Sequence, residues 1–290
     1  MEQYFINCIR MNNDKIYCMS QIVISQNEFN NITKALANIN KLKLLYEIPY
    51  SLKINYMLFE EYLNTNNFTS DLNFEKYNNH ILEINRLVSN ILSSFNIIEP
   101  YFENILGKNM FKNDFKPKIT SKHFDTTFEY GFLYNLRNFT LHNSIPITKL
   151  NFEFKGKEQN VKIFIDKKKL LEDSQYFRSI KDKFAKMPNE IDIVSIIKTE
   201  VPLLLEAIKK YIYTYYLGMK TDINLILSYQ NKLRSVISSK WSDDELSYFI
   251  SNKRKSKNLS NRLPSEFIKL FLSDMESCIT HSTTHEFNEV

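Results

Sequence analysis

The chain is poor in the residues that make tight turns and covalent cross-links. It has only 4 glycines and 7 prolines among 290 residues, which argues against a sandwich of many short strands. Its 3 cysteines, Cys8, Cys18 and Cys278, include no closely spaced pair. We therefore expect no disulfide framework and a reducing compartment.

The sequence also lacks the segments that direct a chain to a membrane or out of the cell. The N-terminus has no basic start followed by an apolar run, so we expect no signal peptide. No apolar run approaches the ~18 residues that a membrane-spanning helix needs. The sequence predicts a soluble, cytoplasmic protein with no membrane partner.

Neither sign of charge dominates the chain strongly. The 38 Lys and Arg residues and 33 Asp and Glu residues give a net charge of +5, which permits an RNA or DNA partner without requiring one. Hydrophobic residues make up 43% of the sequence, enough to bury a large core in one or two domains.

Apolar residues recur at spacings of three and four over most of the chain, which predicts a mainly α-helical fold. We expect Pro49 to end a first helix, Pro100 to start a new one, and Pro202 to lie in the first turn of another. Ser70 or Asp71 is the expected cap of a long helix. The remaining helices are expected over 51–63, 121–143, 167–171, 222–238, 242–250 and 264–277.

Extended segments are expected in two places. Residues 4–9 and 15–24 form either a hairpin or an irregular lead-in, and residues 150–155 and 160–165 form a small hairpin around Gly156. The basic stretch 108–118 is expected to be a loop. This predicts a lead-in over 1–25, a helical domain over 26–240, and a basic helical extension with a polar tail over 241–290.

One stretch, residues 129–147, gathers polar side chains at the end of an aromatic-rich helix. Arg137, Asn138 and His142 lie near its end, and Pro146 then forces the chain out. Histidine exchanges protons near neutral pH and arginine neutralises a phosphate oxygen, so the pair suits metal-free RNA cleavage by the ribose 2′-hydroxyl. The alternative is that both are cations that stabilise a helix C-terminus.

Helix geometry separates the arginine from the histidine. Five residues turn an ideal helix by about 500°, which leaves Arg137 and His142 ~140° apart. Asn138 lies four residues before His142 and shares its face, so we expect its amide to hold one imidazole nitrogen. Tyr134 and Asn135, one turn earlier, are expected to extend this polar face.

The segment LRNFTLHNSIPI, residues 136–147, resembles the signature of the HEPN family. HEPN nucleases carry an arginine, four to six further residues and a histidine, often with a polar residue directly after the arginine. Arg137, Asn138 and His142 match this pattern. The resemblance implies a HEPN-like helical bundle, with the small hairpin as an insertion after the motif helix.

The resemblance also implies a function. A HEPN nuclease of this type is a metal-independent endoribonuclease that uses no cofactor. Two copies of the chain would bring both Arg/His sets to one cleft. Arg137 would stabilise the scissile phosphate, His142 would transfer protons, and Asn138 would orient His142. Such a ribonuclease would be a toxin or an anti-phage defence effector, restrained by an antitoxin or a trigger. The alternative is a non-catalytic helical module that binds RNA or acts as a protein adaptor.

Three further features have weaker functional interpretations. The basic run Lys253, Arg254, Lys255 and Lys257 would contact an RNA backbone, with a solvated loop as the alternative. Cys278, His281 and His285 have the spacing of metal ligands, but we expect accidental spacing in a polar tail and no metal site. We interpret His80 and His123 as isolated surface or half-buried residues.

Overall fold

The protein is described from a computed structural model. The described residues are 3–12, 15–65, 73–143, 147–155, 158–172, 174–237, 246–251, 267–268 and 270–273. The fold is mainly helical, as predicted, with two small antiparallel sheets. None of its described helices has the length and apolarity needed to cross a bilayer.

The chain divides into two compact units, Met1–Leu44 with Ile212–Val290, and Leu45–Tyr211. The division falls within helices α1 (Gln26–Thr65) and α9 (Ile193–Leu217). The domain boundaries predicted at residues 25 and 240 stay a prediction. The first unit also contains β1 (Tyr4–Asn12), β2 (Lys15–Ile24), α10 (Lys220–Arg234) and β6 (Leu246–Ser251).

The second unit contains the other elements. Its helical elements are α2 (Phe74–Leu106), α3 (Lys108–Met110), η1 (Phe111–Phe115), α4 (Lys116–Lys118), α5 (Thr120–Thr126), α6 (Phe128–Thr140), α7 (Lys167–Glu172), η2 (Ser174–Ile180) and α8 (Lys181–Ala185). Its strands are β3 (Ile147–Lys155), β4 (Glu158–Asp166) and β5 (Glu190–Asp192).

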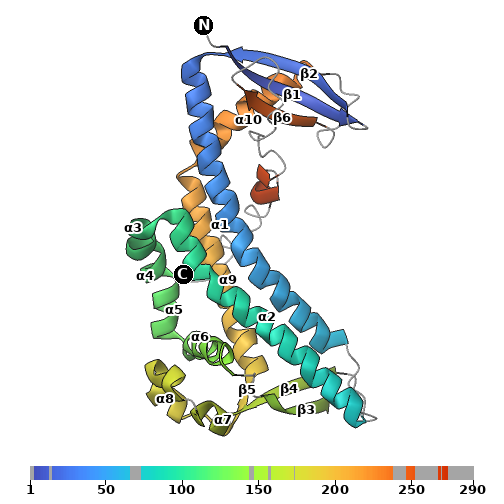
Figure 1. Cartoon of the computed structure of the whole chain (residues 1–290), viewed down its shortest axis with the longest axis vertical. Helices are drawn as coiled ribbons and strands as arrows, with labels where there is room; N and C mark the ends of the chain where they lie inside the picture. Colours follow the sequence, from blue (N-terminus) through green and yellow to red (C-terminus); the bar gives the residue numbers. More distant parts are fainter. Residues whose placement is uncertain are drawn as a thin grey trace, which may run out of the picture. The chain divides into compact units, whose positions relative to one another are not determined.

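The first unit is built on a sheet in the order β2-β1-β6 (Figure 1). The N-terminal hairpin is confirmed, with Tyr4 opposite Ile24. The prediction of a helix over 242–250 is wrong for the part that the structure describes. Leu246–Ser251 forms β6 and pairs with β1. Helix α10 contacts both β1 and β2. The helical residues 267–268 and 270–273 agree with the amphipathic segment predicted there.

Helix α1 begins at a capping box. The Ser25 hydroxyl accepts from the Glu28 N–H at 3.2 Å, and the Glu28 carboxylate accepts from the Ser25 N–H at 2.8 Å. The other Glu28 oxygen accepts from the Tyr229 hydroxyl at 2.6 Å. These hydrogen bonds lower the pKa of Glu28 to about 2, and the bond from Tyr229 has the largest effect. The cap therefore ties the start of α1 to α10.

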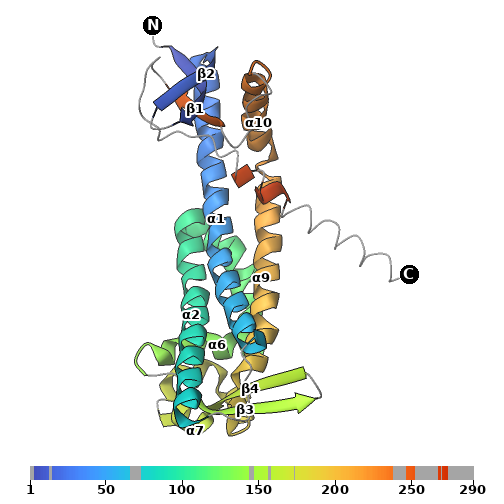
Figure 2. The same cartoon turned by 90° about the vertical axis from the view of Figure 1, so that its right-hand side faces the viewer.

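Long helices form the core of the second unit. The part of α1 in this unit lies beside α2 in both views (Figures 1 and 2), and polar side chains join the two. Asn55 donates to the Ser94 hydroxyl at 2.6 Å, and Ser51 and Ser94 lie within hydrogen-bond distance at 3.2 Å. The helix boundaries expected at Pro49 and Pro100 are wrong, because both prolines lie inside continuous helices. Pro202 lies in the interior of α9 rather than in its first turn, where it was expected. The cap of α2 is Asn73 rather than Ser70 or Asp71.

The basic stretch predicted as a loop is helical. Residues 108–118 form α3, the π-helical turn η1 and α4. The π turn buries both Phe111 and Phe115, and the Phe115 ring stacks on Phe102 with centroids 4.0 Å apart. Asp114, in the same turn, accepts from the Tyr211 hydroxyl at 2.8 Å. Burial of two aromatic rings therefore orders a segment whose lysines suggested a solvated loop.

The second hairpin is confirmed and extended. Strands β3 and β4 pair as predicted, and β5 adds a third antiparallel strand on the other side of β4. Asp166 accepts from the Lys168 N–H at 2.8 Å and so caps α7.

The capping box predicts a pH-dependent contribution to stability. In the folded protein the pKa of Glu28 lies below its ordinary value of 4.5. The Glu28 carboxylate therefore stabilises the fold above pH ~4.5 and loses that effect as the pH falls towards 2. We expect Glu28→Gln to lower the free energy of unfolding by roughly 1 kcal/mol at pH 7, a modest value because solvent screens this group. The difference from wild type should shrink below pH 4.5, as measured by denaturant titration. Glu75→Gln, at an exposed first-turn glutamate of α2, is the control, and a Glu28→Gln deficit that is constant with pH would contradict the assignment.

Candidate functional site

The predicted motif lies on α6 and in the turn that follows it. The helix expected over 121–143 is interrupted at Thr127, whose extended backbone (φ −113°, ψ 135°) separates α5 from α6. Helix α6 then buries one face against α2 and η2. Its buried residues are Tyr130, Gly131, Phe132, Leu133, Asn135, Leu136 and Phe139.

Two residues fix α6 against η2. A Cβ atom on Gly131 would lie 2.8 Å from the Ile180 side chain, so only glycine permits this approach without a shift. Asn135 is 4% exposed, donates to the Gly131 carbonyl at 2.6 Å, and exchanges hydrogen bonds with Ser179. The prediction that Asn135 extends the polar face is therefore wrong, because its side chain is buried in packing.

Arg137 is half-buried and free of carboxylate partners. Its Nη1 donates to the Asn138 Oδ1 at 3.0 Å, and its carbonyl accepts from the Thr140 hydroxyl at 2.9 Å. Among the described residues it forms no ion pair. Its positive charge is thus available to an anionic ligand.

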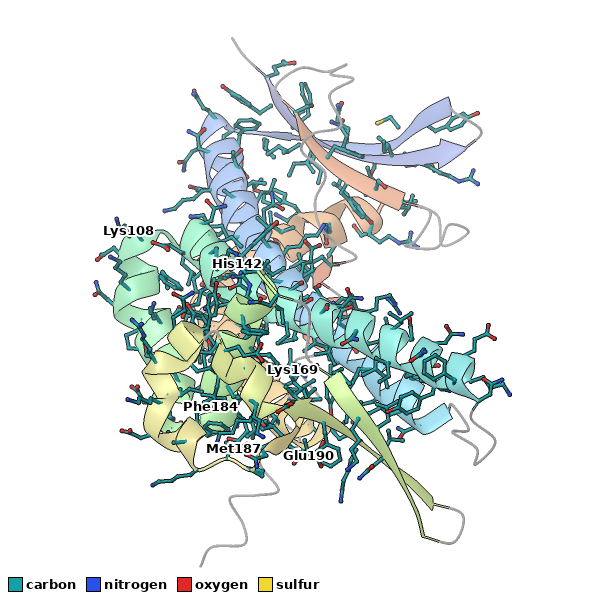
Figure 3. All side chains as sticks on the ribbon, turned by 60° about the horizontal axis from the view of Figure 1, so that its bottom comes forward. Lys108, His142, Lys169, Phe184, Met187 and Glu190 are labelled. Atoms are coloured by element: carbon teal, nitrogen blue, oxygen red, sulfur yellow. The ribbon has the colours of Figure 1, made fainter. Side chains whose placement is uncertain are left out.

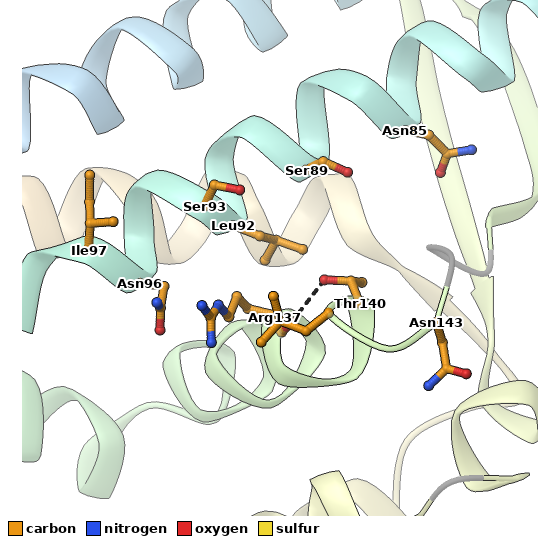
Figure 4. A pocket seen from close by; sticks show the side chains of 10 residues that line it. Asn85, Ser89, Leu92, Ser93, Asn96, Ile97, Arg137, Thr140 and Asn143 are labelled. Atoms are coloured by element: carbon orange, nitrogen blue, oxygen red, sulfur yellow. Dashed lines mark hydrogen bonds between the residues drawn. The ribbon is translucent and has the colours of Figure 1, made fainter.

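Arg137 lies in a groove of about 470 Å³ between α2 and α6 (Figure 4), hereafter the Arg137 groove. Its guanidinium extends towards the end of the groove where Asn96 lies. Among the described residues no carboxylate lines the groove, and six of its ten lining residues carry an amide or a hydroxyl. The lining residues are Asn85, Ser89, Leu92, Ser93, Asn96, Ile97, Arg137, Thr140, Leu141 and Asn143.

The α2 wall of this groove was not predicted from the sequence. Asn85, Ser89, Ser93 and Asn96 recur at spacings of four, four and three, and therefore share one face of α2. The Oδ1 atom of Asn85 is shielded from solvent and has no hydrogen-bond partner among the described residues. A polar stripe beside the apolar stripe of the same helix was the signal available in the sequence.

His142 lies just past the C-terminal end of α6 (Figure 3). Its backbone N–H donates to the Phe139 carbonyl at 3.2 Å, which continues the helix by one tight turn. The side chain is exposed, and its ring stacks on Tyr176 with centroids 5.8 Å apart and planes at 18°. No described residue forms a hydrogen bond with its imidazole. His142 is therefore accessible but does not line the Arg137 groove.

The structure brings together only part of the predicted site. Asn138 accepts from Arg137 and does not bond to His142, so its predicted partner is wrong. Tyr134 is 37% exposed and lines a different pocket. The basic residues Lys253, Arg254, Lys255 and Lys257 lie outside the described residues, as do Cys278, His281 and His285. Within the described ranges, no three His, Cys, Asp or Glu side chains are grouped as a metal site.

A second polar pair in this unit was missed by the sequence analysis. His123 is not isolated, because its Nδ1 lies 2.7 Å from a carboxylate oxygen of Glu200. The side chains are 13% and 0% exposed, and the second Glu200 oxygen has no hydrogen-bond partner among the described residues. The two residues are far apart in sequence, so no local pattern pointed to this pair. His80 is also paired, with the Tyr62 hydroxyl 2.7 Å from its Nδ1.

Comparisons with known proteins do not assign this site. No protein-family model, no curated protein and no solved structure matches the chain.

The buried pair predicts a strong effect on stability. His123→Ala would leave the Glu200 carboxylate buried without its partner, which typically costs about 3–5 kcal/mol. We expect His123→Ala with Glu200→Gln to recover part of that loss, as measured by denaturant unfolding of both single variants and the double variant. Arg86→Ala removes an exposed ion pair with Glu83 and is the control, which should change stability far less because solvent screens that pair. Additive single effects at 123 and 200 would rule out the coupling.

Proposed function

We propose that this chain is a metal-independent endoribonuclease of the HEPN type. The observation that supports this most is the Arg137 groove, where the described residues give the guanidinium no ion pair and line the space with no carboxylate. A phosphodiester is an anion whose oxygens accept hydrogen bonds, and a ribose offers hydroxyls that donate and accept. Arginine, amides and hydroxyls together complement such a backbone.

The proposed reaction needs one proton acceptor, one proton donor and one stabiliser of charge. The 2′-hydroxyl loses its proton to a base and attacks the neighbouring phosphorus, while the bond to the 5′-oxygen of the next nucleotide breaks and that oxygen takes a proton from the donor. The products are a 2′,3′-cyclic phosphate and a 5′-hydroxyl. In this proposal Arg137 stabilises the charge that develops on the phosphoryl oxygens, and His142 exchanges the proton.

The proposed site needs two copies of the chain. Arg137 lines the groove, whereas His142 projects from the turn beyond α6 and stacks on Tyr176. A homodimer in which His142 of one copy faces the Arg137 groove of the other would complete the catalytic set. RNA is thus the proposed substrate, and a ribonuclease of this kind would serve as a toxin or anti-phage effector under the control of an antitoxin or trigger.

One observation favours the alternative, a module that binds RNA without cleaving it. The imidazole of His142 has no hydrogen-bonded group that would fix its tautomer, among the residues that are described. A groove that binds phosphates without a positioned base would bind RNA and leave it intact.

The two functions are separated by substitutions at the motif. We expect Arg137→Ala and His142→Ala each to reduce RNA cleavage by at least ~100-fold, because each removes a group that acts in the transition state. The measurement is the rate of appearance of cyclic-phosphate ends on a labelled RNA. Arg86→Ala, at an exposed arginine of α2 outside the groove, is the matched control. If RNA is bound by the wild type but never cut, the binding module is correct.

The groove itself is tested by binding. We expect Ser89→Ala with Asn96→Ala to weaken RNA binding about tenfold, since two polar contacts are lost. Arg137→Ala should reduce the slope of log affinity against log salt by about one, because one phosphate contact disappears. Filter binding in His142→Ala, where RNA stays intact, measures both quantities. Asn79→Ala, at an exposed residue of α2 outside the groove, is the control, and an unchanged slope would remove Arg137 from the interface.

A further inference from the structure

A second pocket, of about 270 Å³, lies beside the N-terminal half of α6. We call it the Tyr134 pocket. Its walls come from α2, α4, α5 and α6, all within the second unit, and include Glu99, Thr120, Phe124, Asp125, Tyr130 and Tyr134. Its size suits one flat organic group rather than a long chain.

Three aromatic rings form the apolar part of the Tyr134 pocket. The ring of Phe124 is perpendicular to that of Tyr134, with centroids 6.2 Å apart and planes at 88°. It is also nearly perpendicular to Tyr130, at 6.4 Å and 79°. Each ring presents an edge or a face to the space, and such surfaces bind nucleobases by stacking with little dependence on their identity.

Two polar side chains of the pocket, Asp125 and Thr120, have no partner among the described residues, whereas Glu99 and Lys116 pair with each other. Asp125 has an exposed side chain and no ion pair among the described residues. Glu99 is neutralised in part by Lys116, whose Nζ lies 3.4 Å away. Thr120 is 1% exposed, and its hydroxyl has no hydrogen-bond partner within the described part of the chain. A buried hydroxyl without a partner is rare in folded proteins, so it points to a polar group supplied by a ligand.

The Tyr134 pocket follows the Arg137 groove along the same pair of helices. Tyr134 lies three residues before Arg137 on α6, and Glu99 lies three residues after Asn96 on α2. Three residues advance a helix by ~4.5 Å, less than one turn. A group held in the pocket and an anion held in the groove can therefore belong to one nucleotide.

We propose that the Tyr134 pocket binds the guanine base of a nucleotide whose phosphate lies in the Arg137 groove. This inference rests on the proposed ribonuclease function and names the base it selects. Guanine presents two adjacent N–H donors, at N1 and N2, which match the two oxygens of one carboxylate such as Asp125. Adenine, cytosine and uracil each place an acceptor next to their donor, and a carboxylate repels it.

The proposal is tested first by nucleotide binding, without RNA cleavage. The full chain is titrated with the monophosphates of guanosine, adenosine, cytidine and uridine, and affinities are measured calorimetrically. We expect guanosine monophosphate to bind at least tenfold more tightly than the others. Asp125→Asn should remove this preference, and Tyr134→Ala should weaken all four nucleotides by roughly tenfold or more. Asp182→Asn, at an exposed carboxylate of α8, should change nothing.

Cleavage mapping then separates the two proposals. Wild type should cut a mixed-sequence RNA next to guanosine, and Asp125→Asn should cut it at all bases. Cleavage without base preference, or equal affinity for all four nucleotides, would overturn the guanine pocket and leave the ribonuclease intact. Selective guanosine binding that needs Asp125, in a protein that never cuts RNA, would support the pocket and overturn the ribonuclease. Circular dichroism shows that each variant is folded, and both substituted side chains are exposed enough to be replaced without loss of a core.

Discussion

The fixed position of α6 between α2 and η2 is the constraint on which both candidate sites depend. Because Gly131 has no Cβ atom, the Ile180 side chain can pack directly against the α6 backbone. Asn135, also on α6, exchanges hydrogen bonds with Ser179 of η2. At the position next to Gly131, Tyr130 packs on Phe95 of α2, with centroids 4.8 Å apart. A helix held on two sides cannot rotate without losing one set of contacts. Its remaining faces therefore present Arg137 and Tyr134 in fixed directions.

Helix α2 supplies side chains to both the Arg137 groove and the Tyr134 pocket. One face of α2 is apolar and builds the core, and the adjacent face carries amides and hydroxyls towards α6. Further along, the same helix contributes Glu99, and α5 adds Asp125 and Phe124. The space along α2 and α6 thus changes from a groove with a free cation to a pocket with carboxylates and aromatic rings. A nucleotide has the complementary division, with an anionic phosphate at one end and a flat base with N–H donors at the other.

The sequence predicted the local features of the fold better than its long-range strand pairing. Both hairpins and the mainly helical character are confirmed, because alternation and three-to-four spacing are local signals. Proline was misleading at Pro49, Pro100 and Pro202, where neighbouring apolar residues such as Leu52, Phe102 and Leu204 are buried and outweigh the ~3 kcal/mol cost of proline in a helix. Strand β6 was missed because its pairing partner, β1, lies more than two hundred residues earlier.

Only the part of the candidate site that belongs to α6 and its following turn was predictable from the sequence. Helical periodicity placed Arg137 and His142 on different faces, and the structure keeps them apart, with Arg137 in the groove and His142 on Tyr176. The partner of Asn138 was not predictable from spacing, because the carbonyl oxygen of an amide bonds more strongly to a neighbouring cation than to a neutral ring. To predict which residues line the groove, one must know how α2 is aligned against α6. No local sequence pattern contains that information. One copy presents the arginine in a groove and the histidine outside it, which is why the proposed catalytic site draws on a second copy.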